Sequence, residues 1–91
     1  MKFINTKTGE ELAVSSGVIL SQGYFSGNKN NMELGQIFRQ NNKYYITNID
    51  GGLLGITHKE EHVSLPRGFE CKIFVGDVIH RGKYSIKIIS G

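Results

Sequence analysis

Short apolar runs, most of them alternating with polar residues, follow one another along the chain at intervals of about eight to twelve residues. Alternation puts successive side chains on opposite faces of a strand, so each run predicts a short β-strand with one buried face. No stretch keeps a helical period over the roughly ten residues that a stable helix needs. We therefore predict an all-β fold with strands over residues 2–5, 11–15, 18–21, 33–39, 43–49, 53–57, 63–65, 69–75, 78–80 and 83–88.

Polar turn residues separate these runs. Asn41 and Asn42 tolerate positive φ and join the two strands of the clearest hairpin. The longest connection is the segment 23–31, GYFSGNKNN, which we predict to be a loop. Thr57 and Glu60 have the spacing of a capping box and predict one helical turn over residues 58–61.

The same alternation predicts which side chains face the core. The expected inward sets are Leu12 with Val14, then Phe69, Cys71, Ile73 and Val75, and finally Tyr84, Ile86 and Ile88. A chain of 91 residues is long enough for one domain and too short for two, so we assign residues 1–91 to a single domain. Twelve glycines against one proline suit a chain with many tight turns.

The reactive side chains do not form a catalytic pattern. Cys71 is the one cysteine, so no internal disulfide is available, and its place among inward residues predicts a packing role. His58 and His62 are four residues apart, but no other pair is spaced to complete a metal site with them. The acidic pairs are adjacent in sequence and would point apart on a strand, and no glycine motif matches a phosphate-binding loop. We predict a protein that is not an enzyme and that holds no metal or cofactor.

Charge and hydropathy narrow further the class of protein to which the chain can belong. The net charge is +3, and the lysines and arginines are scattered, so the chain permits nucleic-acid binding without requiring it. The first residues do not show the basic and apolar regions of a signal peptide, and no apolar run approaches the roughly 20 residues of a membrane span. We expect a soluble, cytoplasmic domain without a membrane segment.

Two stretches resemble the two ends of a forkhead-associated (FHA) domain. One is GEELAVSSGVILSQG over residues 9–23, and the other is VGDVIHRGKYSIKI over residues 75–88. In both, glycines such as Gly17, Gly76 and Gly82 would turn between antiparallel strands whose alternating residues pack two sheets face to face. The resemblance implies a small antiparallel β-sandwich that acts as a protein-interaction module.

The chain departs from the phosphopeptide-binding FHA pattern. Those members have Gly-Arg after the third strand and Ser-x-x-His on the next, whereas here Tyr24 follows Gly23 and no Ser-x-x-His precedes Gln36. The arginine that would pair with phosphothreonine is missing, so the resemblance implies recognition of a protein or peptide without a strong phosphate clamp. It also implies a docking role such as degenerate FHA-like domains have in bacterial secretion machines. The loop residues left to contact a partner are Ser26, Asn28, Lys29, Asn30, Asn31 and Asn48.

Residues 35–89 also resemble an S1-type OB fold, a barrel that binds single-stranded RNA. Under that alternative, Tyr44 or Tyr45 and His58 would stack on bases, while Arg81 and Lys83 would help to hold phosphates. The S1 resemblance leaves the first 34 residues without a place, which favours the FHA-like sandwich. A third hypothesis, a structural subunit that self-associates through an exposed strand edge, stays open as well.

Overall fold

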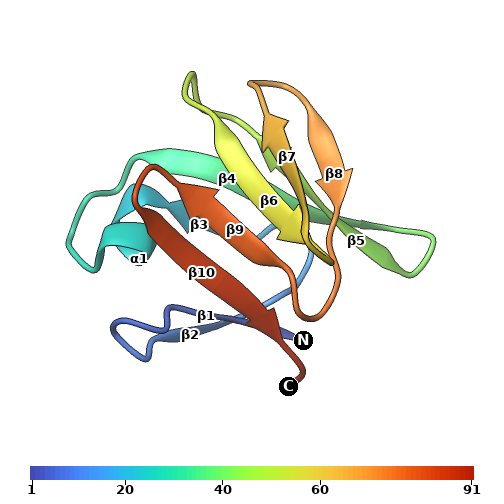
Figure 1. Ribbon diagram of the computed structural model, residues 1–91, viewed down its shortest axis with the longest axis horizontal. Coiled ribbons are helices and arrows are strands. Elements are labelled where there is room, and N and C mark those ends of the chain that lie inside the picture. Colours follow the sequence, from blue (N-terminus) through green and yellow to red (C-terminus); the bar gives the residue numbers. More distant parts are fainter.

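The chain folds into ten β-strands in two antiparallel sheets, with one short helix (Figure 1). This computed structural model describes residues 1–91. The larger sheet has the strand order β2-β1-β10-β9-β6-β7, and the smaller sheet has the order β3-β4-β5-β8. The bounds are β1 Lys2–Ile4, β2 Glu11–Ala13, β3 Ile19–Ser21, α1 Gln22–Ser26, β4 Glu33–Gln40, β5 Lys43–Asn48, β6 Leu54–His58, β7 Glu61–Leu65, β8 Glu70–Lys72, β9 Val78–Arg81 and β10 Tyr84–Ile89. The predicted all-β sandwich is confirmed.

The core lies between the two sheets and is built from the inward faces of alternating strands. Ile37 and Ile46 from the smaller sheet and Ile56, Ile79 and Ile86 from the larger sheet are at most 1% exposed. The full buried apolar set also includes Phe3, Val14, Leu20, Tyr24, Phe25, Leu34, Leu54, Leu65, Ile73 and Ile88. β-Branched side chains fit such pleated, buried surfaces well.

The connections occupy two distinct ends of the sandwich. Strand registers such as Gly35↔Asn48 and Leu54↔Leu65 place five connections at one end, which we call the loop end: residues 5–10, 22–32, 49–53, 66–69 and 82–83. The other end, which we call the turn end, carries residues 14–18, 41–42, 59–60 and 73–77. In Figure 1 the loop end lies toward the left and top, and both chain termini lie at the turn end.

Two tight hairpins shape the turn end. Asn41 and Asn42 have φ of 53° and 64°, as predicted for that hairpin. Lys59 and Glu60 have φ of 46° and 71° and join β6 to β7 in the same way, so the predicted helical turn over residues 58–61 is wrong. The pairing of Leu54–His58 with Glu61–Leu65 supplies the hydrogen bonds that a lone helical turn would lack.

Two other expectations also need correction. Strand β8 spans Glu70–Lys72 alone, so Phe69 and Val75 fall outside it and are 62% and 54% exposed instead of inward. The prediction assumed one strand running from Phe69 to Val75, in which alternation would have turned both side chains inward. The segment 23–31 is not wholly loop either, because Gln22–Ser26 forms the helix α1, with Ser21 as N-cap and left-handed Gly27 as C-cap.

The helix α1 has five residues, and the structure offers no helix with the length and apolar character to span a bilayer.

Candidate functional site

The segment between β3 and β4 folds back on itself around Gly23. The Gly23 amide donates to the carbonyl of Asn30 (2.8 Å), and the Gly23 carbonyl accepts from the amides of Gly27 (2.8 Å) and Asn28 (3.1 Å). A Cβ at position 23 would lie 2.5 Å from the carbonyl oxygen of Asn28 and 2.6 Å from that of Asn30. Because both neighbours are backbone atoms, only glycine lets the two limbs of this segment approach so closely.

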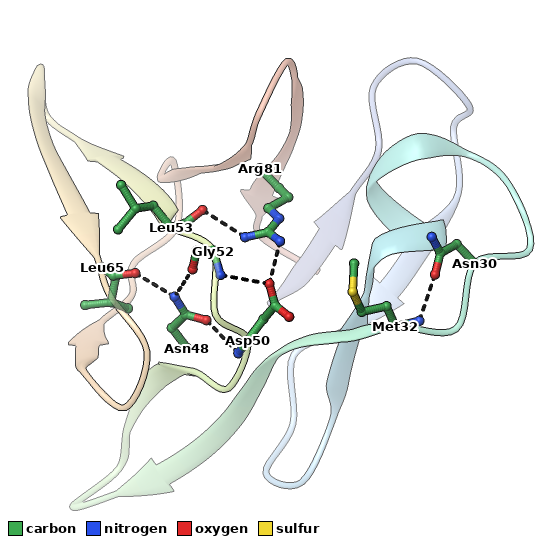
Figure 2. Close-up of polar contacts among 8 residues, drawn as sticks. All are labelled: Asn30, Met32, Asn48, Asp50, Gly52, Leu53, Leu65 and Arg81. Carbon is green, nitrogen blue, oxygen red and sulfur yellow. Dashed lines mark hydrogen bonds and ion pairs between the residues drawn. The ribbon is translucent and has the colours of Figure 1, made fainter.

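Three of the predicted contact residues hold this segment in shape. Asn28 Oδ1 accepts from the Asn30 amide (3.0 Å), and Asn30 Oδ1 accepts from the Met32 amide (2.9 Å; Figure 2). Ser26 Oγ donates to the carbonyl of Gln22 (2.9 Å). Their side chains therefore close turns inside the segment, a common use of asparagine and serine.

Lys29 and Asn31 behave differently from their neighbours. Both are exposed, and neither side chain makes a hydrogen bond or an ion pair within the chain. They project from a segment that the hydrogen bonds of Asn28 and Asn30 already fix. Of the residues predicted in this segment, these two are the ones free to contact a partner.

The side chains of α1 attach this segment to the core. Tyr24 and Phe25 are 7% and 1% exposed, and the Tyr24 hydroxyl donates to the carbonyl of Glu10 (3.0 Å). Burial, helped by the charge of Glu10, raises the pKa of Tyr24 to about 12. The sequence alone did not indicate this anchoring role for Tyr24.

A buried asparagine ties α1 to the connection between β1 and β2. Asn5 is 1% exposed, and its Nδ2 donates to the carbonyls of Tyr24 (2.7 Å) and Phe25 (3.2 Å). Its Oδ1 accepts from the amides of Lys7 (2.9 Å) and Thr8 (3.2 Å). One side chain thus joins two connections of the loop end.

Asn48 does the same for the other half of the loop end (Figure 2). It is fully buried, and its Nδ2 donates to the carbonyls of Gly52 (2.7 Å) and Leu65 (2.6 Å). Its Oδ1 accepts from the amide of Asp50 (2.9 Å). Asn48 was predicted as a contact residue, and the structure places its side chain beneath the surface, where it holds the loops.

An ion pair closes the β5–β6 connection over β9. Asp50 Oδ2 accepts from the Gly52 amide (3.0 Å) and from Arg81 Nη2 (2.5 Å), while Arg81 Nη1 donates to the carbonyl of Leu53 (3.3 Å; Figure 2). The Gly52 amide is the largest influence and lowers the pKa of Asp50 below its ordinary value; burial opposes this, and the Arg81 guanidinium adds to the lowering. A Cβ at position 52 would lie 2.6 Å from Arg81 Cζ, so glycine is needed for this arrangement.

The fixed loops present exposed apolar side chains. Leu53 is 59% exposed and Phe69 is 62% exposed. Asn48 holds the connections that carry both residues. Its side chain bonds Gly52, next to Leu53, while its backbone amide donates to the Phe69 carbonyl (3.0 Å) and its backbone carbonyl accepts from the Gly68 amide (2.7 Å). Sequence reasoning missed these two residues because it placed them in strands, although each follows directly on a glycine in the printed sequence.

A small polar cavity of about 240 Å³ lies beside α1 at the same end. Its lining includes Asn5, Phe25 and Tyr84, together with Lys7 and Lys83. The Lys7 and Lys83 ammonium nitrogens lie 5.9 Å and 5.4 Å from the centroid of the Tyr84 ring. The loop end therefore carries cationic, amide and apolar groups on connections whose conformations are fixed by hydrogen bonds.

The residues predicted for RNA binding are not brought together. Tyr44 and Tyr45 are neighbours on β5 and point to opposite faces, with Tyr44 packed against the core and Tyr45 stacked on Phe38 at 5.2 Å between ring centroids. His58 lies at the turn end, where its Nδ1 contacts Asp77 Oδ1 (2.5 Å). Arg81 and Lys83 lie at the loop end, and Arg81 is occupied by Asp50.

The other reactive side chains have structural partners. His58 and His62 face different groups, because His62 Nδ1 and His80 Nε2 both contact Thr57 Oγ1, at 3.2 Å and 3.0 Å. Burial, followed by the charge of Asp77, raises the pKa of the half-buried Cys71 thiol. No group of three or more histidine, cysteine or acidic side chains converges to hold a metal ion.

Comparison with known proteins agrees with this architecture. No protein-family model matches the chain, and no curated protein matches it by sequence. Among solved structures, the chain is similar to the FHA domain of human APLF, solved in complex with an XRCC1 bisphospho peptide. The TM-score is 0.74 at 16% sequence identity, and the match covers 98% of this chain and 96% of that one. The fold is thus an FHA-like β-sandwich, as predicted, and the S1-type barrel is not favoured.

Proposed function

From this FHA-like fold, we propose that the domain is a non-catalytic protein-interaction module whose loop end binds a peptide segment of a partner protein. The carrying observation is the loop end itself, in which Asn5, Asn48 and the Asp50–Arg81 pair fix the connections in one arrangement. A surface ordered before binding loses less conformational entropy when a partner docks. Binding there therefore needs fewer contacts to reach a given affinity.

The exposed groups on this surface suit a peptide. Leu53 and Phe69 offer apolar contact area, and Lys29 and Asn31 offer a free cation and a free amide. Interfaces between a protein and a peptide combine a few apolar anchors with hydrogen bonds to the backbone of the peptide. The solved FHA domain with a similar fold was crystallised with a peptide bound, which supports a peptide as the class of ligand.

We propose that recognition does not depend on a phosphate. The position after Gly23 holds Tyr24, which is buried and donates its hydroxyl to Glu10. Of the two arginines at the loop end, Arg81 is already paired with Asp50, and Arg67 lies in the 66–69 connection and not in the segment that follows Gly23. The bisphospho peptide belongs to the similar human protein and is not carried over to this chain.

The proposal can be tested with a displayed library of random peptides. Selected peptides should bind wild-type protein and bind the Lys29→Ala/Asn31→Ala variant about tenfold more weakly, because two contacts are removed. Leu53→Ser and Phe69→Ser should weaken binding as well. The matched control is Lys87→Ala/Gln40→Ala, which removes the same side-chain types from exposed positions outside the loop end. Peptides that bind all three loop-end variants as tightly as they bind wild type would refute a loop-end site.

Three further proposals concern the machine in which the domain docks, its location in the cell and its self-association. A docking role in a bacterial secretion or assembly machine would be tested by co-purification from a strain that expresses such a machine. A cytoplasmic, reducing location is supported by the single half-buried Cys71, which has no disulfide partner. The open edges β2, β7, β3 and β8 are available for self-association, which sedimentation measures directly.

A further inference from the structure

A groove of about 280 Å³ opens at the turn end, at the opposite end of the sandwich from the loop end. It lies between the β4–β5 turn and the segment that follows β8. Its apolar lining comprises Met1, Tyr44, Ile73, Phe74 and Val75. Lys43 and Lys72 are its charged residues, and no acidic residue lines it.

The two lysines of the groove are held next to each other. Tyr45 pairs with Lys72 across β5 and β8, so Lys43, Tyr45 and Lys72 project from the same face of the smaller sheet. Lys72 Nζ lies 4.7 Å from the centroid of the Phe74 ring, which fixes its direction. Contact with the Lys43 ammonium, followed by desolvation, lowers the pKa of Lys72. An anion placed between the two ammonium groups would relieve their repulsion.

No carboxylate of the chain forms an ion pair with Lys43 or Lys72, although Glu70 lies on the same face of β8 as Lys72. Asp77 follows the groove segment closely but is 1% exposed, and its oxygens accept from the Phe74 amide and contact His58. The remaining ion pairs are Lys2 with Glu11 and Arg81 with Asp50. Lys43 and Lys72 therefore face solvent as an uncompensated pair of positive charges.

The apolar part of the groove is also left open. Phe74 and Val75 are 38% and 54% exposed, next to the two lysines. A ligand that places carboxylates between the lysines and an apolar side chain on Phe74 and Val75 would satisfy both features. A nucleic acid would set its bases against Tyr44 and Phe74, but its phosphates would need a longer track of cations than Lys43, Lys72 and the neighbouring Arg39.

We propose that the turn-end groove is a second docking surface, which binds an acidic peptide segment of a partner protein that also carries apolar side chains. The carboxylates of that segment lie between Lys43 and Lys72, and an apolar side chain packs on Phe74 and Val75. This surface shares no residue with the loop end, so it stands or falls independently of the proposed function. A module with both surfaces can bridge two segments of its partners.

The test uses fluorescence anisotropy with three short labelled peptides: alternating glutamate and leucine, alternating glutamate and serine, and alternating lysine and leucine. The glutamate–leucine peptide should bind best. The variant Lys43→Gln/Lys72→Gln should weaken that binding about tenfold, and Val75→Ser should weaken it about threefold. The control Lys83→Gln/Lys87→Gln removes the same net charge from exposed positions outside the turn end and should leave the affinity unchanged, as should the loop-end variant Lys29→Ala.

Several results would overturn the proposal. Equal weakening by the control double variant would show a general charge effect, and equal binding of the lysine–leucine peptide would show simple hydrophobic adsorption. Absence of binding by the glutamate–leucine peptide would also exclude the site. A wild-type dimer in sedimentation that Lys43→Gln/Lys72→Gln converts to monomer would instead assign the groove to a second copy of the chain. Thermal unfolding of each variant checks that the fold is retained.

Discussion

The two ends of the sandwich solve the same problem of connecting strands in opposite ways. At the loop end, long connections are fixed by side-chain hydrogen bonds from Asn5 and Asn48 and by the Asp50–Arg81 pair. At the turn end, short turns such as Asn41–Asn42 are fixed by the backbone hydrogen bonds of the strands they join. The loop end thus carries its polar groups in satisfied, partly buried pairs, whereas the turn end leaves Lys43 and Lys72 uncompensated.

This difference separates polar groups that stabilise the fold from polar groups that are free to bind a partner. Polar side chains at the loop end contribute to folding, so few of them remain free for a partner. At the turn end Asp77 is likewise buried and bonded to the Phe74 amide, but the exposed Lys43 and Lys72 contribute little to folding and remain available. Substitutions at the two ends should accordingly differ in their effect on the free energy of unfolding, and the following predictions measure that difference.

The largest effect is expected for Asn48→Ala. This change leaves the carbonyls of Gly52 and Leu65 and the amide of Asp50 without their partner in a buried position. We expect a loss of about 3 kcal/mol in the free energy of unfolding. Urea denaturation measures the loss, and Asn31→Ala, at an exposed position without a hydrogen bond, should cost less than about 0.5 kcal/mol. Similar costs for the two variants would mean that Asn48 does not hold the loop end.

A smaller effect is expected for Gly52→Ala. The new methyl group would collide with the Arg81 guanidinium and displace it from Asp50. We expect a loss of about 1 kcal/mol. Gly51→Ala is the matched control, since a Cβ there meets nothing within 4 Å. Thermal unfolding of both variants, with amide spectra of residues 49–53, decides whether the ion pair depends on glycine at position 52.

Acid sensitivity gives a third comparison. Because the pKa of Asp50 is lowered in the folded protein, its contribution is complete above the unfolded value of about 3.9 and is lost as the pH falls through the lower folded value. Between about pH 6 and about pH 3, wild-type protein should therefore lose more stability than Asp50→Asn. Urea midpoints at both pH values measure the difference. An equal loss in the two proteins would show that the ion pair contributes nothing.

The smallest effect, and one of opposite sign, is expected at the turn end. Lys72→Gln removes a charge that Lys43 repels, so the denaturation midpoint should stay unchanged or rise slightly at low salt. Added salt should reduce any rise, because the charges face solvent. A clear drop in the midpoint would mean that Lys72 supports the fold, and the contrast between the two ends would be lost.

The strands were predictable because a buried face repeats every second residue. Alternation located Leu54–His58, Tyr84–Ile89 and the hairpin over 33–49 within a few residues. It could not tell where a strand stops, which is why Phe69 and Val75 were placed in the core. The helix α1 was missed because five residues are too few to show a period, although Ser21 and Gly27 are ordinary helix caps.

The candidate site was predictable only as a region. The Gly23–Asn31 segment could be marked as a polar connection, but the roles of its residues depend on hydrogen bonds within the folded loop. The burial of Asn48 depends on Leu65, seventeen residues away, and the partner of Arg81 lies thirty-one residues away. No local sequence pattern predicts contacts between residues so far apart in the chain. The groove at the turn end was missed for the same reason, since Lys43 and Lys72 meet only when β5 pairs with β8.

The pairing of β1 with β10 has a practical consequence for rearranging the chain. Lys2 lies opposite Ile89, so the first and last strands run side by side and both ends emerge at the turn end. Joining them by a short linker and opening the chain at Asn41–Asn42 should give a circular permutant with the same sandwich. Inserting the whole domain into a surface turn of a carrier protein would likewise leave its five loops pointing outward, as a scaffold for displaying grafted peptides.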